Sequence, residues 1–279
     1  MNLKMYFSTA RQQLYQLVHA SPNFDLAAAA LYIAQEEDPN IDVNEYLHVL
    51  DTMAEEVQER LPQPAYPLRM MQIINHYLFE ELGFTGNTED YYDPRNSFLN
   101  QVLERRTGIP ITLSLVYLEI ARRLDFPMVG VNFPGHFLIR PDREDMDIHI
   151  DPFHKGEILF DQDCQDRLAQ IYGRPTPLDV RFLQAVTPRQ LIVRLLTNLK
   201  HIYLSQRQVE LCLAACERIL LVDPDQTSEL RDRGILYYHL DRWTEARQDL
   251  EDYLATNPSA EDKSLANQLL KRIDLGLSP

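Results

Sequence analysis

His136 and Asp151 are the two residues of this sequence whose types and surroundings best fit joint chemistry. Each lies in a short segment rich in valine, isoleucine and phenylalanine, as is typical of a β-strand. On neighbouring strands, an imidazole and a carboxylate can share a hydrogen bond that fixes the tautomer of the ring and raises its basicity. Such a pair acts as a general base, binds a ligand, or only satisfies the hydrogen-bonding groups of its own two side chains in a shallow cleft. The sequence leaves these alternatives open.

A metal site on the same strands is a further alternative. His149 and Asp151 alternate along one predicted strand and are therefore expected to face the same side of it. With His136 they would supply two imidazoles and one carboxylate, a set that some metal ions accept, and His154 follows closely. A lone His-x-Asp motif recurs by chance, so we predict no metal and no cofactor. His149 remains a candidate ligand-binding residue.

The three cysteines, Cys164, Cys212 and Cys216, are too few and odd in number for a disulfide framework, which fits a reducing compartment. Cys212 and Cys216 stand four residues apart within a helical pattern. No histidine or cysteine follows them at the spacing of a four-ligand zinc site. We therefore predict that they are buried as small apolar side chains.

Helices and one small sheet are expected to position the candidate residues. Apolar residues at helical spacing, with proline or glycine at the ends, predict helices over most of residues 5–82. The segment after Pro110, ITLSLVYLEIARRL, is apolar nearly all round and predicts a buried central helix. Three segments have strand character and are separated by turn residues: 128–133, 136–140 and 148–153. A small antiparallel sheet packed on a central helix makes this region α+β.

Residues 84–95, FTGNTEDYYDPR, have turn residues and no sustained period, which predicts a loop long enough to carry a function. Its two tyrosines, Tyr91 and Tyr92, either line a pocket or anchor the loop on the core. With Asn96 they are candidate binding residues. A helix over 97–107 follows and is expected to end in a left-handed residue at Gly108.

A domain boundary is expected near residue 186. The segment DQDCQDRLAQIY predicts a helix that ends at Gly173, and an irregular linker with three prolines follows it. Beyond the linker the pattern is entirely helical. We therefore predict a first domain over 1–186 and an all-α domain over 187–279.

The C-terminal domain shows an internal repeat. Asp223-Pro224 and Asn257-Pro258 stand 34 residues apart, which is the tetratricopeptide period. The later unit fits the repeat well, whereas the earlier one has Lys200 where the first helix should carry a small residue. Two repeats are fewer than the three or so that stand alone, so they are expected to pack on the first domain. They either bind a protein or peptide partner or only brace that domain.

Charge and hydropathy exclude several classes of partner. The formal net charge of −15 repels polyphosphate, so nucleic acid is a poor partner, and basic or apolar partners are favoured.

The longest apolar runs fall short of the roughly 20 residues of a membrane-spanning helix. The N-terminal residues lack an apolar region that ends in a cleavage site. The expected location is the cytoplasm, and the oligomeric state is not predicted.

A family resemblance rests on three motifs of the first domain. The stretch RNSFLNQVLERRTGIPITLSLVYLEIARRL, with FPGHFLIR and IDPF, resembles the SirB-type branch of the transglutaminase-like superfamily over roughly residues 25–180. That resemblance implies a mainly helical, papain-like α+β domain with a small antiparallel sheet. It also implies tetratricopeptide-like repeats at the C-terminus. Active members of the superfamily use a cysteine, a histidine and an aspartate as a triad.

The chain departs from that triad at one position. His136 and Asp151 match the family histidine and aspartate. In active relatives the cysteine lies fifteen residues before the glycine of a closing Leu-Gly-Ile-Pro turn. Here the turn is LDFP, and counting back from Asp125 gives Pro110. Proline keeps the helix start, where a dipole and an imidazolium would activate a thiolate, but it removes the thiol.

Two hydroxyls near the vacant position could replace the cysteine. Thr112 and Ser114 lie inside the predicted helix, but a hydroxyl nucleophile needs a placed base and an oxyanion site. We therefore predict a non-catalytic binding or regulatory protein, with a cleft beside His136 and Asp151. The alternative is a hydrolase or amide-transferring enzyme that uses Ser114, Thr112 or water.

Overall fold

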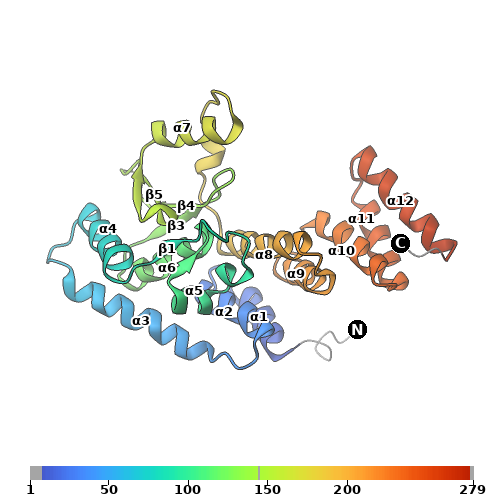
Figure 1. The fold of residues 1–279 in the computed structure, drawn as a ribbon, viewed down its shortest axis with the longest axis horizontal. Helices are drawn as coiled ribbons and strands as arrows, with labels where there is room; N and C mark the ends of the chain where they lie inside the picture. The colour runs from blue at the N-terminus through green and yellow to red at the C-terminus, as the bar shows by residue number, and fades with distance from the viewer. Residues whose placement is uncertain (1–7, 144, 277–279) are drawn as a thin grey trace. The chain divides into compact units, whose positions relative to one another are not determined.

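The computed structural model describes residues 8–143 and 145–276 (Figure 1). The chain divides into two compact units, Met1–Ile192 and Val193–Pro279. The predicted boundary after residue 186 stays a prediction, since a single helix, α8 (Pro188–Ser205), spans the division between the units. None of the described helices is both long enough and apolar enough to cross a membrane.

Helices form the N-terminal part of the first unit, as predicted. They are α1 (Thr9–Ala20), α2 (Leu26–Glu37), α3 (Val43–Arg60) and α4 (Pro67–Asn75), which continues as the π-helical turn η2 (His76–Glu81). Three of them begin with a side chain that accepts a backbone N–H and so satisfies one of the unpaired amides of the first turn: Ser8, Asp25 and Asp42. Pro67 begins α4, where its missing N–H costs nothing.

Helix α6 (Pro110–Arg123) is the centre of this unit, which confirms the predicted buried helix. Every residue from Pro110 to Ala121 is buried, because helices and strands surround it on all sides. It packs against α2, α3, α5 (Leu99–Arg105) and the first two strands of the main sheet. It also packs against the short 3-10 helix η4 (Pro152–His154).

The main sheet has four antiparallel strands in chain order: β3 (Met128–Val131), β4 (Leu138–Pro141), β5 (His149–Asp151) and β6 (Glu157–Leu159). The three predicted strands are present, although each is shorter than expected. The fourth, β6, was missed because three residues are too few to show an alternating pattern. The α+β class is confirmed, and Figure 1 shows this sheet with α6 on one side.

The exit from α5 differs from the prediction. Arg106, not Gly108, adopts the left-handed conformation, with φ 53°. Gly108 instead belongs to a short parallel pair, β1 (Thr85–Gly86) with β2 (Thr107–Gly108). It is needed for space, because a Cβ there would lie 2.7 Å from the Thr112 hydroxyl. A glycine in the sequence indicates a possible left-handed residue at a helix end, whereas an arginine does not, so the left-handed Arg106 could not be predicted.

The end of the first unit follows the prediction more closely. Helix α7 (Asp161–Tyr172) ends at Gly173, which has φ 64° as expected for a left-handed cap. The buried residues Cys164 and Leu168 of α7 pack with Val131, Phe133 and Leu138 of the sheet region. A 3-10 helix, η5 (Val180–Leu183), then leads to an isolated bridge between Ala185 and Val131. Helix α7 is therefore fixed on the sheet by an apolar core.

The second unit contains the remaining helices: α9 (Val209–Val222), α10 (Thr227–His239), α11 (Trp243–Ala255) and α12 (Ala260–Asp274). Helices α10 and α11 pack closely where Gly234 lies against Leu250, as the repeat pattern requires. Cys212 and Cys216 are free and buried, which confirms their predicted packing role. Lys200 is also buried, and its ammonium group lies 2.5 Å from Glu229 and 3.0 Å from Asp232.

Candidate functional site

Asp151 is the fixed point of the candidate site. It ends β5, and Pro152 immediately begins the 3-10 helix η4. The carboxylate oxygen Oδ1 accepts the backbone N–H groups of Phe153 and His154, at 3.0 and 3.2 Å. Because the side chain is fully buried and held by its own backbone, its second oxygen, Oδ2, has a defined direction.

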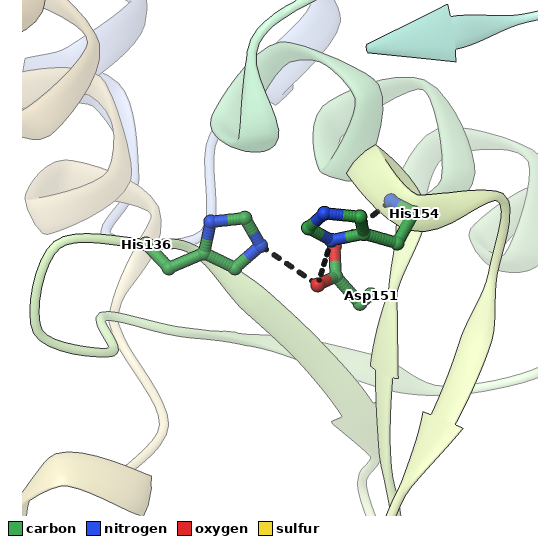
Figure 2. Close-up of side chains that lie close together, drawn as sticks. All are labelled: His136, Asp151 and His154. Carbon is green, nitrogen blue, oxygen red and sulfur yellow. Dashed lines mark hydrogen bonds and ion pairs between the residues drawn. The ribbon is translucent and has the colours of Figure 1, made fainter. Parts of the chain in front are cut away.

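Two imidazoles point at that second oxygen (Figure 2). Nε2 of His136 and Nδ1 of His154 each lie 2.8 Å from Oδ2 of Asp151. A carboxylate only accepts hydrogen bonds, so each of these nitrogens donates one. In the uncharged tautomer that makes this hydrogen bond, Nδ1 of His136 is the acceptor nitrogen. His136 itself lies in the turn between β3 and β4, after Gly135 at φ 67°, and not on the strand where the sequence places it.

A guanidinium group lies next to the carboxylate of Asp151 and offsets its negative charge. Arg167 of α7 donates from one nitrogen to Oδ2 of Asp151 and from another to Glu157 of β6, the latter at 2.5 Å. Burial by itself raises the pKa of Asp151, but hydrogen bonds from His136 and His154 and the charge of Arg167 lower it by more than burial raises it. The net pKa lies well below the usual value for a carboxyl group. Asp151 is therefore an anion at neutral pH.

A cavity of about 540 Å³ opens beside this cluster. His136, His154 and Arg167 line it, and three further carboxylates contribute to its wall: Glu157, Asp163 and Asp166. The apolar lining comes from Phe133, Leu159 and Ile171. Among these lining residues, three carboxylates face a single permanently charged cation, Arg167, which makes this cleft suited to a positively charged group.

An aromatic contact joins the predicted loop to the cluster. The ring of Phe153 lies 5.8 Å from that of His136 and 6.2 Å from that of Tyr91, both edge to face. Tyr92 in turn packs on Tyr91 at 5.4 Å and is largely exposed. The structure thus places the two candidate tyrosines next to the cluster, with Tyr91 reaching it through Phe153.

The side chain of Asn96, which directly follows the predicted loop, forms hydrogen bonds to residues of that loop. Its amide nitrogen donates to the carbonyl of Asp90 at 2.8 Å, and its amide oxygen accepts from Asn87 at 3.1 Å. The side chain is fully buried. Asn96 therefore holds the backbone of the loop that carries Tyr91, and its predicted part in binding stays a prediction.

The two candidate hydroxyls make no hydrogen bond to His136. Oγ1 of Thr112 donates to the carbonyl of Asn96 at 2.8 Å and accepts the N–H of Ile109 at 3.0 Å, so it caps the start of α6. Oγ of Ser114 is fully buried and has no hydrogen-bond partner within the described chain. Pro110 is the first residue of α6, as predicted, and its side chain offers no nucleophile.

His149 lies apart from the cluster, so the alternative set of His136, His149 and Asp151 does not come together. The donor atoms that come together, within 4.8 Å of one another, belong to His136, Asp151 and His154. His149 is buried and lines another cavity with Asp161 and Arg140, and neither of its ring nitrogens has a partner in the described residues. Burial lowers its pKa, so the ring is neutral.

Sequence reasoning noted His154 only as a residue close to the candidate set, and it missed two further members of the site, Arg167 and Glu157. A signal existed for His154, because residues three apart in a 3-10 turn lie on the same side, and Asp-Pro starts such a turn. No local signal marks Arg167 or Glu157. They reach Asp151 only because α7 packs on the sheet.

Comparison with known proteins agrees with these features. The profile of the transglutaminase-like superfamily matches residues 44–197, and a tetratricopeptide repeat profile matches residues 199–271. A UPF0162 protein of Xylella fastidiosa is 40% identical over 238 residues, which cover 84% of each chain. Protein SirB1 of Salmonella typhimurium is 29% identical over 213 residues, covering 75% of this chain and 78% of the relative.

A eukaryotic relative shares only part of its length. F-box only protein 21 of Homo sapiens is 34% identical over 195 residues, which cover 63% of this chain and 29% of that protein. No solved structure is a significant match. The chain therefore belongs to the transglutaminase-like superfamily, in its SirB-type branch, and carries tetratricopeptide repeats after the transglutaminase-like domain.

Proposed function

We propose that this protein is a non-catalytic binding or regulatory protein. In this proposal the cleft beside His136 and Asp151 holds a peptide segment, and the repeat domain contributes a second contact with a protein partner. Tetratricopeptide repeats generally mediate protein–protein interaction, which supports the second contact. In this proposal, the protein uses the active-site architecture of the superfamily for recognition and not for covalent chemistry.

One observation carries the non-catalytic part of the proposal. By the family resemblance, Pro110 takes the position of the nucleophilic cysteine of active relatives, and neither nearby hydroxyl forms a hydrogen bond to His136. Thr112 is committed to capping α6, and Ser114 is sealed in the core away from any base. A hydroxyl without a hydrogen-bonded base is a weak nucleophile at neutral pH.

The lining of the cleft supports a basic segment as its ligand. Glu157, Asp163 and Asp166 contribute carboxylates to the wall, and the whole chain is acidic. Phe133 and Ile171 offer apolar surface for the methylene stem of a lysine or arginine. The expected ligand is therefore a peptide with an exposed lysine or arginine side chain.

Fluorescence anisotropy with the full-length protein tests this function. The probes are labelled peptides that differ only in one central residue, which is lysine, arginine, glutamine or glutamate. We expect the basic peptides to bind about tenfold more tightly than the others, because rim charges on the protein favour them. All measurements contain a metal chelator, so that bound ions play no part.

Two variants locate the binding in the cleft. Asp166→Asn should weaken binding of the basic peptides several-fold, because it removes a carboxylate of the cleft wall. Glu55→Gln makes the same charge change on an exposed position of α3 and should leave the affinity unchanged. Equal affinities for all four peptides, or equal effects of both variants, would refute the proposed ligand.

A second candidate is a hydrolase that uses water. The hydrogen bond of 2.8 Å between His136 and Asp151 leaves Nδ1 of the imidazole as an acceptor, and the cleft is open to solvent. Such a histidine can act as a general base on water. Turnover of amide or ester substrates that is abolished by His136→Ala would favour this candidate over the binding protein.

A further inference from the structure

We propose that His136, His154 and Asp151 form a binding site for a divalent transition-metal ion. The ligand atoms are Nε2 of His136, Nδ1 of His154 and Oδ2 of Asp151. Two imidazoles and one carboxylate suit ions of intermediate softness, zinc among them. This inference goes beyond the proposed function, since peptide binding is defined there in the absence of metal.

The three atoms already have nearly the required separation. They lie within 4.8 Å of one another, and each nitrogen is 2.8 Å from the carboxylate oxygen. In a tetrahedral site, metal–ligand bonds of about 2.0–2.2 Å place neighbouring ligand atoms about 3.3–3.6 Å apart. Shifts of less than about 1 Å therefore suffice to admit an ion between the carboxylate and the two rings.

The backbone fixes the carboxylate in the orientation that a metal needs. The amides of Phe153 and His154 hold Oδ1 of Asp151, so Oδ2 alone is directed at the imidazoles. Outer contacts of this kind orient the ligands of a metal and raise its affinity. Because Asp151 and His154 belong to one short turn, two of the three ligands are placed by the same local structure.

The surroundings leave room for further ligands. Asp151 is buried, His136 is mostly buried, and His154 has about half of its side chain exposed. The cavity of about 540 Å³ adjoins both histidines. Three protein ligands with an accessible fourth position are typical of sites that bind water or a substrate group at the metal.

Arg167 is the natural competitor of a metal at this site. Its guanidinium group donates to Oδ2 of Asp151, the same oxygen that would bind the ion. Two cations cannot share that oxygen without strong repulsion. Arg167 also pairs with Glu157 at 2.5 Å, so it can leave Asp151 and keep a carboxylate partner. Metal binding and the pairing of Arg167 with Asp151 are therefore mutually exclusive.

The competition gives the proposal a distinctive test. Zinc affinity of the full-length, untagged protein is measured by competition with a chromophoric chelator. His154→Ala removes a ligand and should weaken zinc binding by at least about tenfold. Arg167→Gln removes the competing cation, although it sits in the same cluster, and should strengthen zinc binding about tenfold. If these residues did not bind a metal, there would be no reason for His154→Ala and Arg167→Gln to change zinc affinity in opposite directions.

Two histidine variants serve as controls. His76 of η2 and His48 of α3 are exposed and lie outside the cluster, and each is replaced by alanine. Both should retain the affinity of the wild type, and circular dichroism verifies that each variant is folded. The affinity should also fall on acidification, because imidazole ligands must lose a proton to bind the ion.

Three outcomes would overturn the proposal. The first is that the wild-type protein does not compete with the chelator for zinc. The second is that His154→Ala binds zinc as tightly as the wild type. The third is that Arg167→Gln binds zinc more weakly than the wild type. Cobalt(II) provides an independent readout, because its absorption spectrum changes when imidazole and carboxylate ligands replace water. That spectrum should be lost in His154→Ala and kept in His48→Ala.

Discussion

Asn75 of α4 donates a hydrogen bond of 2.7 Å from its side-chain amide to the carbonyl oxygen of Gly156, in the turn between β5 and β6. Gly156 has φ +74°, and a Cβ there would lie 2.4 Å from Cγ of Asn75. Its N–H also donates to the carbonyl of Asp151 at 2.9 Å. This contact fixes the turn that follows η4 and so holds His154 over Asp151.

The first prediction concerns this contact. Gly156→Ala should lower the free energy of unfolding by about 2–4 kcal/mol, because left-handed strain adds to a steric clash. Gly173→Ala is the matched control, since Gly173 also has positive φ but has open space around it. It should cost only about 1–2 kcal/mol. Urea unfolding measures both values, and equal losses would show that the clash is relieved.

The second prediction concerns pH. Burial raises the pKa of Asp151, but His136, His154 and Arg167 bring it well below the usual value. A carboxyl group with a lowered pKa in the folded protein stabilises the fold fully above its unfolded pKa, about 4. That contribution is lost as the pH falls from there towards the folded value.

Asp151→Asn tests this dependence. At pH 7 the variant should be less stable than the wild type by about 3 kcal/mol, because a buried charge network is broken. The difference should shrink at pH 3, where the wild type has lost part of the same contribution. Parallel stability curves for the two proteins between pH 7 and pH 3 would contradict the assignment.

The third prediction separates the two hydroxyls. Ser114→Ala should leave stability unchanged or raise it by about 1 kcal/mol, because the buried Ser114 hydroxyl has no hydrogen-bond partner within the described chain. Thr112→Val should cost about 1–3 kcal/mol, because it breaks the bonds to Asn96 and Ile109. Neither variant should change peptide binding in the cleft. A loss of ligand binding in Ser114→Ala would restore that residue as a functional candidate.

The fourth prediction addresses the vacant nucleophile position. Pro110 is buried at the start of α6, so the thiol of Pro110→Cys should react with iodoacetamide as slowly as the three native cysteines, which are also buried. Ser114→Cys, which is deeper in α6, should behave in the same way. Fast alkylation of Pro110→Cys that slows in the double variant Pro110→Cys, His136→Ala would contradict this expectation and would show that the imidazole reaches the start of α6.

The fifth prediction concerns the repeat domain. Lys200→Met should lower stability by about 3–5 kcal/mol, because it leaves Glu229 buried without its partner at 2.5 Å. The double variant Lys200→Met, Glu229→Met should recover most of that loss, since a buried ion pair and an apolar pair are of similar stability. Lys271→Met on the exposed face of α12 should change little. A double variant as unstable as Lys200→Met would contradict this account.

The sequence by itself determined the elements and their class. Proline at 110 followed by an apolar segment predicted the buried helix α6, and the spacing of Asp223 and Asn257 predicted the repeats. It also predicted that His136 and Asp151 pair, which the structure places at 2.8 Å. These features depend on local periodicity or on residue types within short motifs, and both can be read along the chain.

Only the tertiary structure decided which side chains surround Asp151. His154, and not His149, joins His136 and Asp151, because Pro152 turns the chain back after β5. Arg167 arrives from α7, and Glu157 comes from a strand too short to predict. Hydrogen-bond partners that are distant in sequence follow from packing, and packing depends on the shape of the whole core. The sequence therefore predicted a pair, and the fold made it a cluster of two imidazoles, two carboxylates and a guanidinium.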